Sequence, residues 1–178
     1  MRTGSAEGVL RHPAYPRGVD HDELIRWYRR NRARTASLLE IPAPDAYEVR
    51  PIELRNPIVF YEGHIPAFAV NTLVKRTLGR GIDEKLERLF ERGIDPSSTS
   101  EVRETTWPDR ETVKRYAAAA DRLVEAALAE GDPEAVFTVL EHEAMHQETL
   151  LYMLHNLPYG MKRAVWSAAD SAATGSAG

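Results

Sequence analysis

The sequence has 178 residues, of which 43% are hydrophobic and 28% charged, the balance of one folded domain rather than of a disordered chain. It contains no cysteine, which excludes disulfides and thiolate ligands from the protein itself, and its net charge of −4 gives no general reason to expect nucleic acid. No run of about 18 apolar residues occurs and the N-terminus lacks an apolar core, so we expect a cytoplasmic protein with no membrane span and no secretory signal.

The first predicted helix follows an N-terminal arm, residues 1–18, which is rich in Gly, Pro and Arg and lacks periodicity. Asp20 and Glu23 resemble a capping box, and apolar residues recur at helical spacing from there to about Glu40. Prolines within residues 41–44 stop this helix, because proline lacks the amide proton. Several arginines lie around this helix. Such a cluster more often marks a solvated helix face than a binding site for an acidic ligand. The arginines are Arg26, Arg29, Arg30, Arg32 and Arg34.

The second predicted helix starts at Asn56-Pro57, with the asparagine as the cap and the proline in the first turn. It continues to Leu78 and ends at Gly79. Pro66 lies inside this stretch, and we expect it to kink the helix or to remove one of its hydrogen bonds.

Two further long helices are predicted in the second half of the chain. A short helix over 83–91 and a loop rich in Pro, Ser and Thr over 93–107 come first. The third long helix spans about 109–129 and the fourth about 134–156, with Gly131-Asp132-Pro133 as the break between them.

Four long amphipathic helices without a credible strand predict an all-α fold, a four-helix bundle. We expect this bundle to occupy residues 19–162. The tail over 163–178 is almost entirely Ala, Ser, Gly and Asp from Ser167 onward and is expected to be disordered.

The strongest chemical signal is the segment EHEAMHQE, residues 141–148, in the fourth predicted helix. Residues four apart share one face of a helix, so His142 and His146 can direct their imidazoles at one ion. A buried imidazole without a partner costs about 1–3 kcal/mol, and a bound metal would satisfy both at once. The alternative is that both are partly exposed or bonded to backbone. Apolar neighbours on the same face favour the metal site; they are Val139, Leu150 and Met153.

The same segment matches the HExxH pattern of zinc proteases, in which Glu143 would be the general base. Such sites need a further protein ligand. Position 152 is tyrosine where a metzincin needs histidine, and no Asp or Glu lies between Thr149 and Ala169. We therefore reject the protease interpretation.

A third ligand must then come from another helix, and His64 is the candidate. It lies between Phe60 and Phe68 at helical spacing on a predicted core face. Alone it would more often be a satisfied core histidine, but the pair at His142 and His146 favours ligation. Three neutral nitrogens leave open coordination positions, as in catalytic sites, and suit zinc, iron, nickel and copper alike.

Two segments carry a resemblance to a known family: NPIVFYEGH, which ends at His64, and HEAMHQE, which starts at His142. Together they resemble the N-terminal DinB-like domain of ergothioneine-synthase-type (EgtB-type) enzymes, nonheme iron sulfoxide synthases that include the selenoneine synthases. The resemblance spans about residues 20–162. It implies a DinB-like four-helix bundle in which His64, His142 and His146 hold iron(II), with zinc as the second choice.

The resemblance also implies an activity. In that family, oxygen is used to join the sulfur of a small thiol to the imidazole of trimethylhistidine, so it implies an oxidoreductase of ergothioneine biosynthesis with a small thiol substrate. It further implies a second, formylglycine-generating-enzyme-like domain, whereas this sequence turns to Ala, Ser and Gly soon after Trp166. We therefore expect the metal-binding half without that domain, which a separate lectin-like subunit could supply, and no full synthase activity from this chain alone. On this model Glu143 supports the ligands or packs, and is not a base.

Two alternatives stay open. A free-standing DinB-type thiol S-transferase would use zinc to lower the pKa of a cofactor thiol. A non-catalytic bundle, either a binding module or a decayed remnant, would show no metal-dependent turnover.

Overall fold

The computed structural model describes residues 20–91 and 105–163. The arm predicted at 1–18, most of the loop predicted at 93–107 and the tail from 164 onward lie outside these residues. The described part is helical and contains no strand, only an isolated bridge between Pro42 and Lys162, so the predicted all-α bundle is confirmed. The helices are α1 (His21–Leu39), α2 (Ile58–Ala69), α3 (Lys75–Leu78), α4 (Glu84–Phe90), α6 (Arg110–Ala127) and α7 (Pro133–Asn156).

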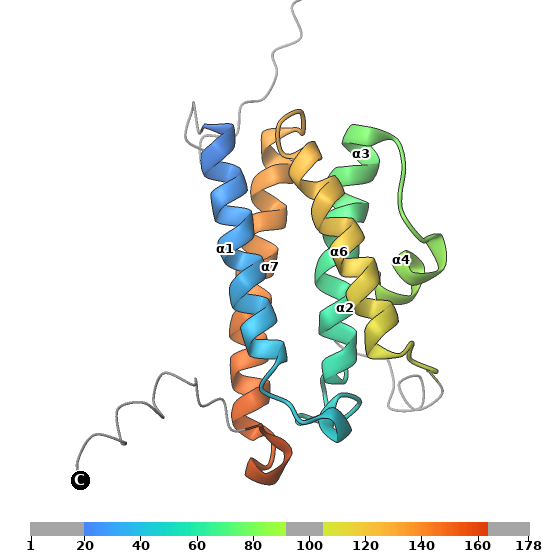
Figure 1. Ribbon diagram of the computed structural model, residues 1–178, viewed down its shortest axis with the longest axis vertical. Coiled ribbons are helices and arrows are strands. Elements are labelled where there is room, and N and C mark those ends of the chain that lie inside the picture. The colour runs from blue at the N-terminus through green and yellow to red at the C-terminus, as the bar shows by residue number, and fades with distance from the viewer. Residues whose placement is uncertain (1–19, 92–104, 164–178) are drawn as a thin grey trace, which may run out of the picture.

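Four long helical stretches form the bundle. The helices α1 and α7 run in one direction and α2 and α6 in the other, and the connection that carries α4 returns the chain along the outside of the bundle (Figure 1). The helix α2 is the central element, because it contacts α4, α6 and α7. Among the described residues, none of the helices combines the length and the apolar character that crossing a membrane would require.

Aspartate side chains cap the starts of four helices by accepting hydrogen bonds from backbone amides of the first turn. They are Asp20, Asp83, Asp109 and Asp132, which begin α1, α4, α6 and α7. The start predicted at Asp20 and the limits predicted for the later helices are therefore correct within a few residues.

The predicted cap of the second helix is wrong. Pro57, and not Asn56, occupies the cap position of α2, and no side chain caps this end. The amides of Ile58 and Val59 instead donate to the carbonyls of Val49 and Tyr47, at 3.3 and 2.9 Å. Backbone from the preceding loop thus satisfies donors that a side-chain cap would otherwise have to satisfy.

The helix that starts at Ile58 continues past Pro66 to Leu78, but not as regular α-helix throughout. Residues Val70–Val74, the segment η2, form a π-helical turn between α2 and α3. The expected disturbance therefore takes the form of a missing amide donor at Pro66 and a wider turn four residues later. Gly79 ends this stretch as predicted, with a left-handed backbone at φ 68°.

Two apolar clusters fill the bundle and meet near the middle of α7. One contains Leu140 with Leu73, and the other contains Leu150 with Phe60. Between Leu140 and Leu150, the inward sides of α7 carry polar side chains, of which three are buried and one is partly buried. These residues are His142, Glu143, His146 and Gln147.

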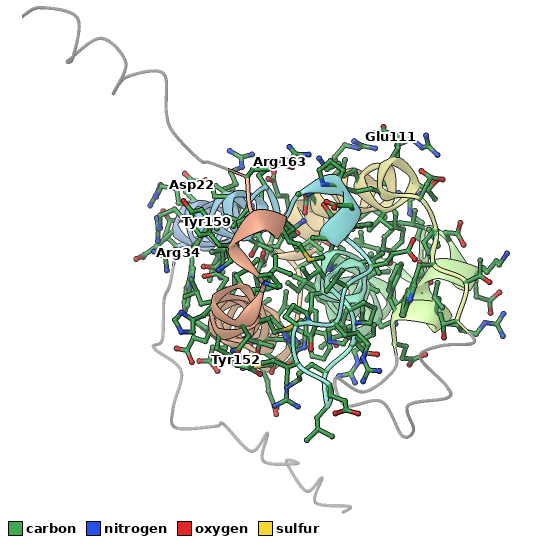
Figure 2. All side chains as sticks on the ribbon, turned by 90° about the horizontal axis from the view of Figure 1, so that it is seen from below. Asp22, Arg34, Glu111, Tyr152, Tyr159 and Arg163 are labelled. Atoms are coloured by element: carbon green, nitrogen blue, oxygen red, sulfur yellow. The ribbon has the colours of Figure 1, made fainter. Side chains whose placement is uncertain are left out.

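The arginines around α1 divide into two groups. Arg29 pairs with Glu125 and Arg32 with Asp121, both on α6, at 2.7 and 2.8 Å. The others are exposed, as the interpretation of a solvated face requires, and Arg34 lies at the periphery of the bundle in the end-on view (Figure 2). They are Arg26, Arg30 and Arg34.

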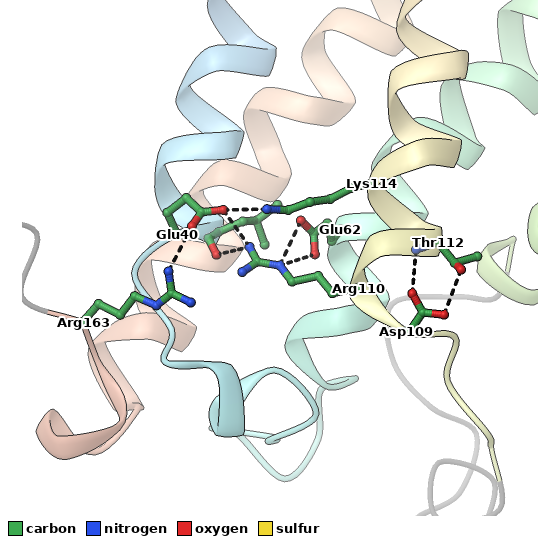
Figure 3. A network of polar contacts seen from close by, with 8 residues as sticks. Glu40, Glu62, Asp109, Arg110, Thr112, Lys114 and Arg163 are labelled. Carbon is green, nitrogen blue, oxygen red and sulfur yellow. Dashed lines mark hydrogen bonds and ion pairs between the residues drawn. The ribbon is translucent and has the colours of Figure 1, made fainter.

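A polar network at the lower end of the bundle joins three helices through Arg110 of α6 (Figure 3). Its guanidinium donates to the Leu39 carbonyl at the end of α1, at 2.6 Å, and to the carboxylates of Glu40 and Glu62, both at 3.1 Å. Glu62 lies on α2 and is buried, whereas Lys114 reaches only the exposed Glu40. Arg110 is therefore the cation that compensates the buried carboxylate.

We expect Arg110→Met to lower the free energy of unfolding by about 3 kcal/mol, because it leaves the buried Glu62 carboxylate without its cation. Lys114→Met removes a cation of the same network from an exposed pair and should cost under about 1 kcal/mol. Urea unfolding measures both. Equal losses would show that Glu62 does not depend on Arg110.

Candidate metal centre

The structure brings together the three histidines singled out in the sequence. His64 comes from α2, and His142 and His146 come from α7. One ring nitrogen from each histidine lies within 4.8 Å of the corresponding nitrogens of the other two. This group could hold a metal ion. The imidazole centroid of His64 is 5.1 Å from that of His142 and 4.9 Å from that of His146. Their role as metal ligands stays a prediction.

The orientation of His64 is set by a backbone carbonyl. Its Nδ1 lies 2.7 Å from the carbonyl oxygen of Phe90, the last residue of α4. A carbonyl oxygen can only accept, so Nδ1 carries the proton and Nε2 keeps its lone pair. That Nε2 is buried and has no hydrogen-bond partner among the described residues. The imidazole is thus held in the tautomer whose Nε2 can bind a metal.

Glycine at position 63 makes this contact sterically possible. A Cβ atom there would lie 2.3 Å from the ring of Phe90, closer than real Cβ contacts come. The absence of a side chain lets the end of α4 pack directly on α2, one residue from His64. The Gly63-His64 pair that ends the segment NPIVFYEGH therefore has a physical basis in this packing.

The other two imidazoles face each other across one turn of α7. The Nε2 atoms of His142 and His146 are 3.1 Å apart. Two nitrogens that are each about 2.1 Å from one ion, at about a right angle, lie about 3.0 Å apart, so this spacing fits shared ligation. His146 is fully buried and its Nδ1 has no partner among the described residues, while His142 stacks on Phe68 at 3.5 Å.

The site keeps its histidines uncharged. Burial, together with the neighbouring histidines, lowers the pKa of His142 to about 2 and that of His146 to about 3. Burial also lowers the pKa of His64, partly opposed by the hydrogen bond to Phe90. Neutral imidazole is the form that binds metal ions, so the site needs little proton release before it can be loaded.

Glu143 does not belong to the histidine group, although it lies within HExxH. Its carboxylate accepts hydrogen bonds from Thr35 at 2.7 Å and from Arg32 at 3.0 Å, both on α1. The residue after His146 also binds α1, because Gln147 donates to the Asn31 carbonyl and to the Thr35 hydroxyl. The geometry therefore agrees with the rejection of a protease base.

Sequence reasoning missed these partners on α1. Asn31 and Thr35 are buried, and Arg32 is about a fifth exposed, in the face of α1 that also carries Leu24 and Leu39. The available signal was polar residues at core spacing in an otherwise apolar stripe. Together they fix the rotation of α7 about its axis, and with it the direction of the two imidazoles.

Comparisons with known proteins agree with this picture. A family model described as the DinB superfamily matches residues 28–155. Ergothioneine biosynthesis protein 1 of Neurospora crassa is 35% identical over 121 residues, which cover 59% of this chain. The protein of the same name from Schizosaccharomyces pombe is 32% identical over 119 residues, or 57% of this chain. The resemblance inferred from the motifs is confirmed, but the chain spans only 14% and 15% of the lengths of these relatives.

The metal-free protein should lose stability as the pH falls from about 7 to about 4. Unfolded histidines take up protons near pH 6.5, whereas His142 and His146 stay neutral down to about 2 and 3. The unfolded state therefore binds more protons than the folded state in this range, and the free energy of unfolding decreases as the pH decreases. Urea unfolding with a chelator present measures the effect. His142→Asn should show a shallower pH dependence, and an unchanged one would contradict a buried neutral pair.

Glu143→Gln should separate packing from ligation. Losing the buried one of the two carboxylates that pair with Arg32 should cost roughly 1–3 kcal/mol of unfolding free energy. Metal affinity, measured by titration with cobalt(II), should change by less than about tenfold. An affinity lost entirely at unchanged stability would instead place Glu143 among the ligands.

Proposed function

The chain belongs to the DinB superfamily, and we propose that its bundle is the metal-binding domain of an ergothioneine-synthase-type enzyme, with His64, His142 and His146 holding iron(II). The observation that carries this proposal is the meeting of three uncharged imidazoles from α2 and α7 in the bundle interior. The names of the two curated relatives support the choice of reaction class.

The donor set fits a redox ion with room for substrates. Bound iron(II) would offer coordination positions to a thiol sulfur and to oxygen, and it would supply electrons for oxygen reduction. The protein contributes three neutral ligands, so the positive charge of the ion is retained and a thiolate is favoured over a thiol. Aromatic rings of Phe60 and Phe68 stack on His64 and His142 and keep water from these faces of the ligands.

The chain matches only a small part of each relative, and we propose that it takes part in the full reaction together with a second domain or subunit. Oxygen-dependent formation of a carbon–sulfur bond would use a small thiol as the substrate. A formylglycine-generating-enzyme-like domain, or a separate lectin-like subunit, would complete the substrate pocket over the histidine group. Glu143 is held by α1 and takes no part in the chemistry.

A second function deserves a test because the same three nitrogens suit zinc equally well. In a thiol S-transferase, the ion would lower the pKa of a cofactor thiol and present the thiolate to an electrophile. Identification of the bound ion distinguishes the two functions.

Protein purified without oxygen should carry one iron per chain. His64→Ala and His142→Ala should each lose it, because two imidazoles hold the ion far more weakly than three. His155→Ala is the control, since this exposed histidine lies at the end of α7 outside the group. Elemental analysis measures the metal, and a cysteine-containing thiol should perturb the absorption of the cobalt(II)-substituted protein.

Other outcomes overturn the proposal in different ways. Zinc in place of iron, with alkylation of an added thiol, would assign the S-transferase. Absence of any bound metal in a folded wild-type chain, even after iron(II) or zinc is added, would leave a non-catalytic bundle.

A further inference from the structure

The short helix α4 contributes no side chain to the histidine group, yet its last residue touches the site. Phe90 is fully buried, and its carbonyl oxygen lies 2.7 Å from Nδ1 of His64. The ring of Phe90 fills the space that Gly63 leaves open on α2. The position of α4 and the state of His64 are thus linked through one residue.

The carbonyl matters because a neutral imidazole carries only one N–H. With the proton held on Nδ1, the lone pair of His64 is on Nε2, the nitrogen without a partner in the interior. Without the Phe90 carbonyl, the Nε2–H tautomer would also be populated, and it has no lone pair for an ion at that atom. Docking of α4 therefore selects the ligating form of His64 and fixes its ring.

Docking of α4 has anchors of its own, away from the histidines. Glu87 is 1% exposed, and its carboxylate fixes the start of α4 by accepting from the amides of Ile82 and Asp83, which lead into the helix, at 2.7 and 3.1 Å. Lys75 of α3 pairs with the same carboxylate at 2.7 Å. At the other end of the helix, the Phe90 ring stacks on Trp107.

A helix of seven residues does not persist by itself, so α4 depends on these contacts. It is an element that can open locally while the long helices stay folded. If His64 is a ligand and its orientation depends on α4, the affinity of the site for a metal ion depends on how firmly α4 is docked.

We propose that α4 is the positioning element of the metal centre, and that metal binding at the three histidines and docking of α4 on α2 stabilise each other. This rests on the proposed ligation by His64. If docked α4 raises the metal affinity by some factor, bound metal must raise the docking equilibrium by the same factor, since the two events share one thermodynamic cycle.

The wild-type chain allows the first test, with cobalt(II) alone as the probe. Adding the ion should slow amide hydrogen exchange in α4 much more than in α1. The nitrogen-15 shift of Nδ1 of His64 should be that of a protonated nitrogen before and after loading. Unchanged exchange in α4 on saturation with the ion would overturn the coupling.

Variants at the distant anchor give the second test. Glu87→Gln weakens the docking of α4 without touching a histidine, and cobalt(II) affinity should fall about tenfold. The same substitution should increase the population of the Nε2–H tautomer of His64 in the metal-free protein. Arg88→Ala is the matched control, because Arg88 lies on the same helix in an exposed pair with Glu84. Its affinity should stay within about twofold.

Failure of this inference looks different from failure of the proposed function. Faster exchange in α4 of Glu87→Gln at unchanged cobalt(II) affinity would overturn the coupling while the three-histidine site stands. Full metal binding in His64→Ala would remove the ligation on which both depend. Coupling observed in a chain that holds zinc would keep this inference and reject the iron-dependent reaction.

Discussion

Three imidazoles placed in an apolar interior set the main constraint on this molecule. Each has lost much of its hydration, so the uncharged form is favoured and the pKa of all three is lowered accordingly. The bundle meets this constraint with a carbonyl at one nitrogen of His64 and with the mutual approach of His142 and His146. The lone pairs that remain form the site.

The helix α7 carries two adjacent stripes of polar residues that face different helices. One stripe, His142 and His146, faces α2; the next, Glu143 and Gln147, binds α1. Because consecutive residues differ by about 100° around a helix, a six-residue segment serves both partners. The motif that resembles a protease signature is better understood as a pair of candidate ligands alternating with a pair of residues that hydrogen-bond to α1.

Much of the fold and part of the site follow from local patterns. Capping aspartates, prolines and glycines mark the helix ends, and the four-residue spacing of His142 and His146 places both on one face. The core spacing of the polar residues on α1 marks them as buried, but their partners were not predictable, because Thr35 and Glu143 are 108 residues apart and no local rule pairs them. Nor was the role of Phe90, since a backbone carbonyl carries no residue-type signature. The start of α2 was misplaced because amides there are satisfied by a loop and not by a neighbouring side chain.

The histidine group draws on two helices, α2 and α7, that are far apart in the sequence. An ion shared by His64 and His142 would join positions in the chain between which α3, α4 and α6 all lie. It would act as a reversible cross-link that closes a long loop and removes conformational freedom from the unfolded chain, as a disulfide does. A protein without a single cysteine would thereby acquire a staple that depends on the metal supply.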